Sequence, residues 1–186
     1  MLFNSKIHGY QLMSLYWHCI NHHDLVILVK SSIGEVFGAF VSTIGHDQHW
    51  RHFLQDPAAF VFVLKSNTME VAKTEYKERA LSVLPTKDSL SIGYDNVSLL
   101  FMGSNLKNGF SSECKELKRP PLCSQEDGNF EIEEVEVWTV ESETVSPRKK
   151  RQSIHEVCGQ NINKLSTVLF GGRQHNHAQY ASFNFK

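Results

Sequence analysis

The first clear pattern of hydrophobic and polar positions predicts a helix near the start of the chain. Leu12, Met13, Leu15, Tyr16 and Cys19 recur at spacings of three and four residues, which places them along one stripe of a helix. The polar sequence INHHD follows directly and ends the pattern. We therefore expect one short amphipathic helix with its apolar stripe against a core.

Runs rich in β-branched and aromatic residues follow and predict strands. Residues 25–30 and 35–41 flank a four-residue turn, SSIG, as in a hairpin. Residues 59–65 (AFVFVLK) are apolar on both faces, so we expect this strand to be covered on both sides and central in its sheet. Further strands are expected at residues 79–84, 89–92 and 97–102, whereas residues 42–57 are expected to form a long loop and residues 71–76 fit either helix or strand.

The last strand, residues 130–140 (FEIEEVEVWTV), has an irregular pattern. Ile132, Val135 and Val137 do not share one parity, which predicts either a bulge near Glu133 and Glu134 or a change of register. With one clear helix and about seven short strands, the pattern predicts a mainly β (α+β) fold. We expect a two-sheet antiparallel β sandwich with short flanking helices.

The composition changes after Val140. Residues 141–153 (ESETVSPRKKRQS) have almost no apolar content and are typical of a solvated linker. We therefore expect a domain at residues 1–140 and a polar, basic linker with a C-terminal tail at 141–186. The basic run is most simply a solvated spacer, although it also fits a nuclear import signal or peripheral contact with anionic lipid or nucleic acid through Arg148, Lys149, Lys150 and Arg151.

Overall charge and cysteine usage narrow the classes of function. The 186 residues carry a net charge of -1 with a pI of about 6.8, so no global field attracts nucleic acid, and none is expected as a specific partner. The four cysteines form no C-x-x-C pair, which favours reduced thiols in the cytoplasm or nucleus. No apolar run approaches the roughly 20 residues of a membrane span.

Candidate chemical groups do not combine into a recognisable motif. His46, His49 and His52 lie close together but in a predicted loop without the H-E-x-x-H pattern, so we expect no metal site. Ser111, Ser112, Cys114 and Cys123 have no G-x-S-x-G frame, and no phosphate-binding glycine loop is present. The acidic residues of this region are expected to face solvent or a partner. We expect neither catalytic residues nor a cofactor.

Several blocks nevertheless agree in order with one family. The stretches LFNSKIHGYQLMSLYWHC, LVILVKSSIGEVFGAF, DSLSIG and NLKNGFSSECKELKRPPLCSQEDGNFEIEEVEVW resemble the TLDc domain, which is shared by oxidation-resistance proteins and some Rab GTPase-activating proteins. The last block lies within residues 101–138. The resemblance implies a two-sheet β sandwich without catalytic residues, resistance to oxidative stress, and binding of the vacuolar proton ATPase to regulate its assembly. The matching positions are structural by type: Gly9 and Gly38 for close backbone approach, Gly93 and Gly109 for turns, and Phe40, Phe62 and Trp138 for the core.

Three departures from the family pattern concern the start of the domain and two loops. The helical sequence that usually precedes the block at Leu2 is absent here, so the domain is expected to lack its customary N-terminal segment. The stretch that resembles FYGTGE in the family is FLQDPA at residues 53–58, without its glycines. The multi-glycine turn after the SLSIG strand is replaced by YDNV.

The sequence thus favours a non-catalytic interaction module that binds a subunit of the vacuolar proton ATPase. Exposed polar loops beside a rigid sheet are where recognition usually lies, so the expected partner-binding residues are Asn105, Lys107, Asn108, Glu126 and Asp127. Two alternatives are a hydrolase or thiol-dependent peroxide-scavenging enzyme, and a fragment of a larger GTPase-regulating TLDc protein. We expect a cytoplasmic location, with the nucleus and the periphery of organelle membranes as alternatives.

Overall fold

A computed structural model describes residues 1–45, 54–65, 68–72, 81–95, 97–115 and 120–140. These residues belong to one compact unit, Met1–Glu141. The predicted tail, including the basic run and Cys158, lies outside the described residues, as do His46, His49 and His52.

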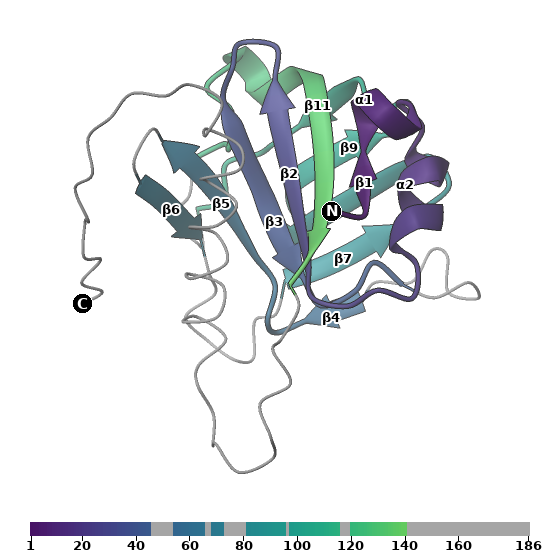
Figure 1. Cartoon of the computed structure of the whole chain (residues 1–186). Coiled ribbons are helices and arrows are strands. Elements are labelled where there is room, and N and C mark those ends of the chain that lie inside the picture. The colour runs from purple at the N-terminus through teal and green to yellow at the C-terminus, as the bar shows by residue number, and fades with distance from the viewer. Residues whose placement is uncertain (46–53, 66–67, 73–80, 96, 116–119, 141–186) are drawn as a thin grey trace, which may run out of the picture. The chain divides into compact units, whose positions relative to one another are not determined.

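The first sheet is antiparallel and contains the predicted hairpin at its centre. In spatial order its strands are β1 (Phe3–Asn4), β11 (Asn129–Thr139), β2 (Leu25–Ser31), β3 (Val36–Val41), β5 (Phe60–Lys65) and β6 (Thr68–Ala72). The apolar strand β5 lies between β3 and β6 (Figure 1). It is an inner strand, but it lies next to the edge strand β6 rather than at the centre of the sheet as expected.

The second sheet is also antiparallel and lies across the core from the first. Its strands are, in spatial order, β4 (Leu54–Asp56), β7 (Leu81–Pro85), β8 (Ser89–Tyr94), β9 (Val97–Gly103) and β10 (Asn108–Phe110). Strand β10 pairs in turn with the first three residues of β11. The mainly β, two-sheet fold expected from the sequence is therefore confirmed.

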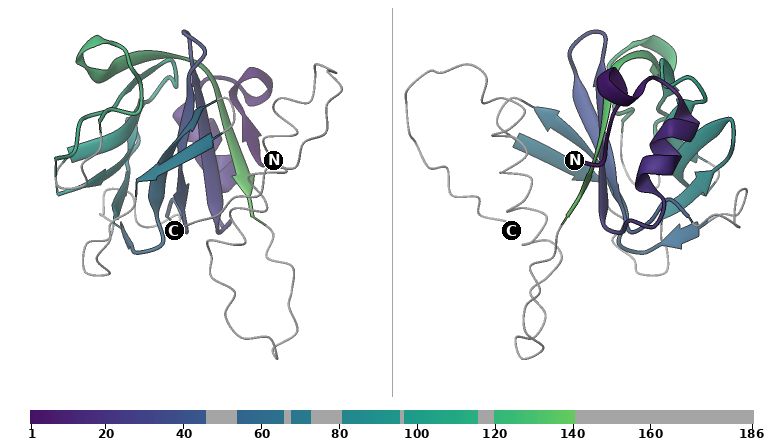
Figure 2. Two further views of the ribbon diagram at one scale, coloured as in Figure 1. Left: turned by 90° about the vertical axis from the view of Figure 1, so that its left-hand side faces the viewer. Right: turned by 45° about the vertical axis from the view of Figure 1, so that its right-hand side comes forward.

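Short helices cover one side of the two sheets. Helix α1 (Ser5–His8) begins at Asn4, whose side-chain oxygen accepts the Lys6 N–H at 2.8 Å. Helix α2 (Leu12–Cys19) has the bounds that the apolar spacing predicts, and its stripe of Leu12, Leu15, Tyr16 and Cys19 is buried. Figure 2 shows both helices on one side of the strands. A third, 3-10 helix, η1, spans Glu126–Gly128.

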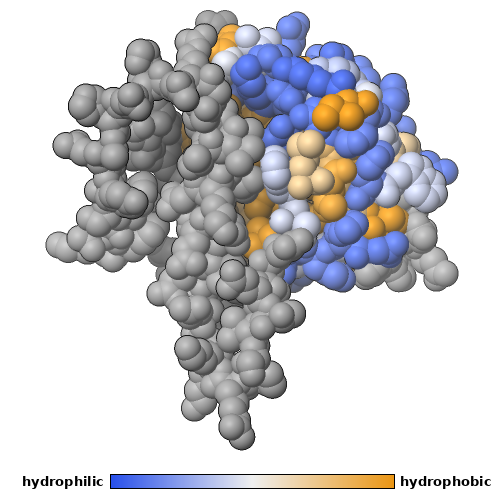
Figure 3. All heavy atoms as spheres, viewed as in Figure 1, coloured by the Kyte–Doolittle hydropathy of each residue, from blue (hydrophilic) through white to orange (hydrophobic). Residues whose placement is uncertain are grey.

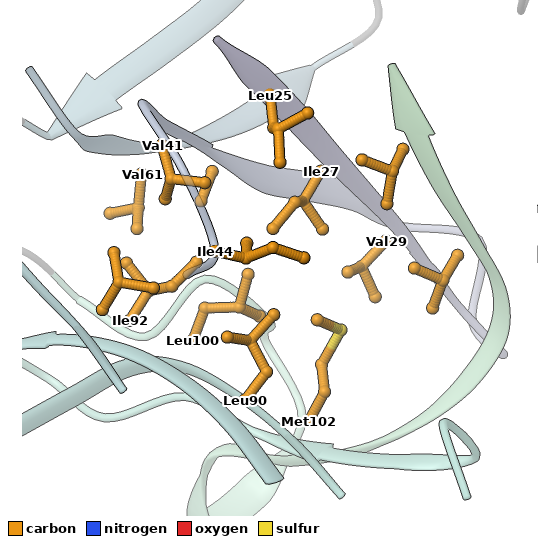
Figure 4. Close-up of a cluster of buried hydrophobic side chains, with 14 of the residues drawn as sticks. Leu25, Ile27, Val29, Val41, Ile44, Val61, Leu90, Ile92, Leu100 and Met102 are labelled. Carbon is orange, nitrogen blue, oxygen red and sulfur yellow. The ribbon is translucent and has the colours of Figure 1, made fainter. Parts of the chain in front are cut away.

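The core lies between the two sheets and is built from alternate residues of their strands. Figure 4 shows side chains of β2 facing those of β8 and β9. Burial of such a side chain contributes roughly 1.5 to 3 kcal/mol through the hydrophobic effect. The fully buried residues of these three strands include Leu25, Ile27, Val29, Leu90, Ile92, Leu100 and Met102.

Strand β11 contains the bulge that its sequence pattern predicts. Its register with β2 changes between Ile132, opposite Ser31, and Glu134, opposite Lys30. Glu133 is the extra residue, and this is why Ile132 and Val135 are both buried although they are three positions apart. A bulge bends its strand, and here Asn129–Glu131 pair with β10, while β11 pairs with β2 at Ile132 and again from Glu134 onward.

Of three aromatic residues expected in the core, Phe40 and Phe62 are buried as expected, whereas Trp138 is not. Phe40 and Phe62 are buried, but strand alternation places them on the face of the first sheet that is turned away from the second. Trp138 is half-buried on that same face, and its indole N–H donates to Glu136 at 3.1 Å. Their sequence pattern shows that they are apolar but does not show which face they occupy.

The glycines also differ in part from expectation. A Cβ on Gly38 would lie 1.9 Å from the Ile27 carbonyl oxygen, which confirms a close approach. Gly93 and Gly109 lie within β8 and β10 rather than in turns, and a Cβ on Gly109 would lie 2.2 Å from the Phe130 ring. Gly9 has no atom within 4 Å of such a Cβ; its positive φ of 85° is what favours glycine there.

The expectation of a continuous loop over residues 42–57 is wrong at its end. Leu54–Asp56 form strand β4 and pair with β7. The buried Asp56 carboxylate accepts hydrogen bonds from the Ser42 N–H, the Ser42 hydroxyl and the Ala58 N–H. For residues 71–76 the sequence fitted either a helix or a strand, and Val71 and Ala72 of this segment lie in strand β6.

The contact at Gly38 predicts a large loss of stability in the Gly38→Ala variant. Its new methyl group would meet a backbone oxygen of the central strand β2, so we expect the free energy of unfolding to fall by about 2 to 4 kcal/mol. Gly103→Ala is the matched control, because its nearest neighbour would be at an ordinary 3.7 Å. Urea unfolding of both variants measures the difference, and equal losses would contradict this packing.

Candidate functional site

The residues expected to bind a partner lie in two loops connected through β10. Asn105, Lys107 and Asn108 belong to the turn from β9 into β10, and Asn108 pairs with Glu131. Glu126 and Asp127 belong to η1, which precedes the start of β11. The two groups are on the order of 10 Å apart along the strand direction. The structure therefore places the two groups at opposite ends of the short strand β10.

The turn between β9 and β10 is held in place from below. Leu106 is fully buried with a positive φ of 47°, and its N–H donates to the Gly103 carbonyl at 3.1 Å. The Ser104 carbonyl accepts the Leu12 N–H of α2 at 2.8 Å. Asn105 and Asn108 are exposed. This turn therefore presents two amides on an anchored backbone.

Lys107 has a contact that the sequence did not reveal. Its ammonium lies 3.1 Å from the centre of the Tyr10 ring, a cation–π contact typical of lysine over an aromatic face. The Tyr10 hydroxyl in turn donates to the Glu133 carbonyl at 2.7 Å. The lysine thus connects the turn to the N-terminal segment, and a partner would meet a positioned cation.

The second loop is held by a hydrogen-bonded backbone. Asp127 is exposed and has a left-handed conformation, with φ 58°. Gly128 follows, and its carbonyl accepts the Ser111 N–H at 2.9 Å. A Cβ on Gly128 would lie 2.1 Å from the Ser111 carbonyl oxygen. The side chain of Glu126 is not among those that the structure describes.

Ser111, considered first as a nucleophile, has a structural contact on each side. Its buried hydroxyl donates to the Leu99 carbonyl at 2.7 Å and accepts the Leu122 N–H at 2.8 Å. A hydroxyl whose proton is committed to a carbonyl is not paired with a catalytic base. Ser111 therefore ties the loop after β10 to the core.

A second set of hydrogen bonds connects the loop after β10 to the hairpin of β2 and β3. The Glu35 carboxylate accepts the Ser124 N–H at 2.9 Å and the Ser124 hydroxyl at 2.6 Å. Partial desolvation acts to raise the pKa of Glu35, but hydrogen bonds from Ser124 and from the Cys123 thiol outweigh it and lower the pKa. Ile33 at the hairpin tip is 53% exposed. The same end of the molecule thus presents Ile33 beside Glu35.

The cysteines of the described part are buried, and two of them have raised pKa values. Burial raises the pKa of Cys19 to about 12. Burial, and also the neighbouring Glu35 carboxylate, raises the pKa of Cys123. Cys114 is buried as well. Because the thiolate is the nucleophilic form, these environments oppose thiol chemistry.

The glutamates of the β11 bulge are paired rather than set up for acid–base catalysis. Lys6 lies 3.0 Å from Glu133 and 2.9 Å from Glu134, and Lys30 lies 2.8 Å from Glu133. Asn4 donates to Glu134 at 2.8 Å and to Glu136 at 2.9 Å. Among the described side chains, no group of three or more His, Cys, Asp or Glu converges as a metal site would require.

The described fold is a β sandwich whose polar loops are held by hydrogen bonds to the rest of the domain. A model of the TLDc domain matches residues 1–141 of the sequence. The chain therefore belongs to the TLDc domain family.

The chain is also similar to several characterised proteins. It is 31% identical to the MTOR-associated protein MEAK7 of Xenopus laevis over 153 residues, which cover 75% of this chain and 31% of that protein. It is 25% identical to the GTPase-activating protein skywalker of Drosophila melanogaster over 152 residues, or 74% of this chain and 26% of skywalker. Oxidation resistance protein 1 of Yarrowia lipolytica is 30% identical over 144 residues, covering 72% and 59% of the two chains.

The alignments leave most of the longer relatives uncovered. The chain spans about a third or less of the MEAK7 and skywalker sequences, so what it shares with them is the domain. Within the part of the chain that the structure describes, no helix is long and apolar enough to cross a lipid bilayer.

The hydrogen bonds to Glu35 predict a pH-dependent contribution to stability. Because the pKa of Glu35 is lowered on folding, its stabilising effect is complete above the ordinary glutamate pKa of about 4.3. It is lost as pH falls through the lower folded pKa. We expect Glu35→Gln to lower the free energy of unfolding by roughly 1 kcal/mol or less at neutral pH, and we expect this effect to decrease as pH falls below about 4.3.

Thermal unfolding of both proteins across this pH range measures the effect. Glu113→Gln, at an exposed position, is the control for removal of a negative charge. A difference between wild type and Glu35→Gln that is the same at every pH would show that the Ser124 hydrogen bonds do not favour the ionised carboxylate.

Proposed function

We propose that this chain is a non-catalytic protein-interaction module that supports resistance to oxidative stress by binding a subunit of the vacuolar proton ATPase and regulating its assembly. Its membership of the TLDc family and its similarity to an oxidation resistance protein support the proposal. The location that goes with this role is the cytoplasm, at the periphery of an organelle membrane.

One observation carries the non-catalytic part of the proposal. Among the candidate nucleophiles of the described region, Ser111 ties the loop after β10 to Leu99 and Leu122, and Cys19 and Cys123 are buried with raised pKa values. The turns on either side of β10 present exposed polar residues instead. Such loops on a rigid scaffold are suited to recognition.

The contact surface in this proposal consists of Asn105, Lys107, Asn108, Glu126 and Asp127. The backbone on either side of it is fixed by the Leu106 anchor and by the Ser111–Gly128 hydrogen bond. A partner would therefore bind without ordering these turns, which lowers the entropic cost of association. A matching partner would present hydrogen-bond donors to Asp127 and to the side-chain amides of Asn105 and Asn108, and a carboxylate opposite Lys107.

A second candidate is regulation of a small GTPase within a longer protein. The similarity to a protein named for GTPase activation favours it, but that similarity is confined to the shared domain. The proposal of a thiol-dependent enzyme is disfavoured by the buried, protonated thiols of Cys19 and Cys123.

Charge reversal on the proposed surface tests the function. We expect Asp127→Lys, alone and with Glu126→Lys, to reduce co-purification of the proton ATPase with the tagged full chain by at least about tenfold, which is typical for loss of an interface charge pair. Asp88→Lys is the matched control because Asp88 is also an exposed turn aspartate, between β7 and β8.

The readouts are the proton-pump subunits recovered with the chain and the survival of cells under peroxide. Equal recovery for Asp127→Lys, Asp88→Lys and wild type would remove the proposed surface. A wild-type chain that recovers no proton-pump subunit would remove the proposed partner.

A further inference from the structure

A second surface, distinct from the loops above, is formed by α1, α2 and the turn that follows. The nineteen residues from Ser5 to His23 contain no Asp or Glu. They contain one lysine and four histidines: Lys6, His8, His18, His22 and His23. We call the segment from Ser5 to His23 the helical layer. Its charge is small when the imidazoles are neutral and strongly positive when they are protonated.

The helical layer also exposes two large apolar side chains. Ile7 is 69% exposed and Trp17 is 68% exposed. Figure 3 shows an apolar patch over α1 among mainly hydrophilic surroundings. The opposite stripe of α2 already fills the core, so packing of the domain does not require Trp17. An exposed tryptophan of this kind indicates a surface that meets another phase or partner.

A ring contact connects the two helices beside these exposed residues. The rings of His8 and His18 lie 4.3 Å apart, and Phe3 packs against both imidazoles, with ring centroids at 5.5 and 5.9 Å. Ile7 and Trp17 are the residues directly before the two histidines in the sequence. The helical layer therefore exposes one apolar side chain from each helix, next to the contact that holds the helices together.

The hydrogen bonds of the two histidines determine where each can accept a proton. The Asn4 N–H donates to His8 Nδ1 at 3.0 Å, so that nitrogen is unprotonated. His18 Nδ1 lies 2.7 Å from the Ser14 carbonyl, which can only accept, so it carries a proton. His18 can therefore accept a second proton at Nε2 and keep this bond. Protonation of His8 at Nδ1 would break its bond to Asn4.

Charged groups on the elements that pack against the layer are mostly paired. Lys6 and Lys30 bind Glu133 and Glu134, while Glu136 accepts from Asn4 and Trp138. The hydrogen bonds from Lys30 and Lys6 lower the pKa of Glu133, so it remains ionised and paired in mild acid. Four further charges at the borders are two of each sign: Asp24, Asp88, Lys87 and Lys107.

The sign of the local charge therefore depends on the histidines. Two lysines, Lys6 and Lys30, against three glutamates of β11 give -1, and each histidine that gains a proton adds one positive charge, so two protonated histidines are enough to make the sum positive. Surface imidazoles in general become charged as pH falls from 7 towards 5. A protruding tryptophan and isoleucine on a surface that becomes positive complement an anionic lipid surface, where tryptophan favours the interface.

We propose that the helical layer binds anionic membranes at mildly acidic pH, with Trp17 and Ile7 entering the headgroup region. This binding uses residues other than those of the proposed protein-binding surface, although Lys107 of that surface contacts Tyr10 of the helical layer. It is also separate from the predicted lipid contact of Arg148, Lys149, Lys150 and Arg151, whose charge does not vary in this pH range. A bilayer fits better than an acidic protein because Trp17 and Ile7 are convex features, which insert into a fluid interface without a matching pocket.

Vesicle sedimentation of the full chain tests the proposal. Vesicles of equal parts phosphatidylserine and phosphatidylcholine are compared with pure phosphatidylcholine at about pH 5.5 and 7.5, on either side of the usual imidazole pKa. We expect the partition coefficient on anionic vesicles to rise roughly tenfold or more on acidification, and little binding to neutral vesicles.

Variants separate the layer from other sources of binding. Trp17→Glu and Ile7→Glu should each abolish most of the acid-dependent increase. Ile33→Glu is the matched control, because Ile33 is also exposed, at 53%, but lies in the turn between β2 and β3, outside the helical layer. His18→Asn keeps a donor for Ser14 but cannot be protonated, so it should weaken the pH dependence. Substitution of Arg148, Lys149, Lys150 and Arg151 by Gln should leave the increase in place.

The possible outcomes decide between this proposal and its rivals. Unchanged melting temperatures at both pH values would show that the variants are folded, and Ile33→Glu would report any general effect of an added charge. If Trp17→Glu and Ile7→Glu bind anionic vesicles at about pH 5.5 as well as wild type does, the proposal is wrong. It is equally wrong if wild type does not bind them, or if the basic-run variant loses the whole increase. Binding to soluble polyglutamate but not to vesicles would point instead to an acidic protein.

Discussion

The extra residue in β11 allows one strand to belong to both sheets. The first residues of β11 pair with β10, and after Glu133 the strand pairs with β2. Without the bulge, a strand of this length would continue along a single sheet. Because the bulge bends β11, Ile132 and Val135 can both face the core while the two sheets are joined at this edge.

Contacts around the bulge also position the surfaces from which we infer function. The Glu133 carbonyl accepts the Tyr10 hydroxyl, and the Tyr10 ring lies under Lys107 of the polar turn. The Ser5 hydroxyl accepts the Val135 N–H at 2.9 Å, which fixes the start of α1 against the strand. The polar turn and the helical layer are thus both placed by one irregularity in β11. The ion pairs of Glu133 are exposed, and exposed pairs contribute little to stability by themselves.

Local patterns predicted much of the fold because they recur within a few residues. The apolar spacing of α2, the turn between β2 and β3, and the broken parity of Ile132 and Val135 are all visible in short windows. Strands β1, β4 and β10 were missed because each has only two or three residues and no measurable period. Their pairing partners are distant in sequence, as with Phe3 and Val137.

The candidate site could be predicted only in part for the same reason. Exposed polar residues such as Asn105, Asn108 and Asp127 follow from turn composition. The contacts that hold their loops do not, since Glu35 and Ser124 are 89 positions apart and Lys107 meets Tyr10 through space. Nor does sequence reveal which face of a strand an aromatic residue occupies, as Phe40 and Phe62 show.

The most direct test of this account separates the loss of the bulge from the loss of the Glu133 charge. Deletion of Glu133 should prevent β11 from bending between β10 and β2, and we predict a loss of more than about 3 kcal/mol in the free energy of unfolding or loss of cooperative folding. Glu133→Ala keeps the extra residue and removes its ion pairs, so it should cost about 1 kcal/mol or less. Urea unfolding of the two variants gives the comparison. Equal effects of deletion and substitution would contradict the central role of the bulge.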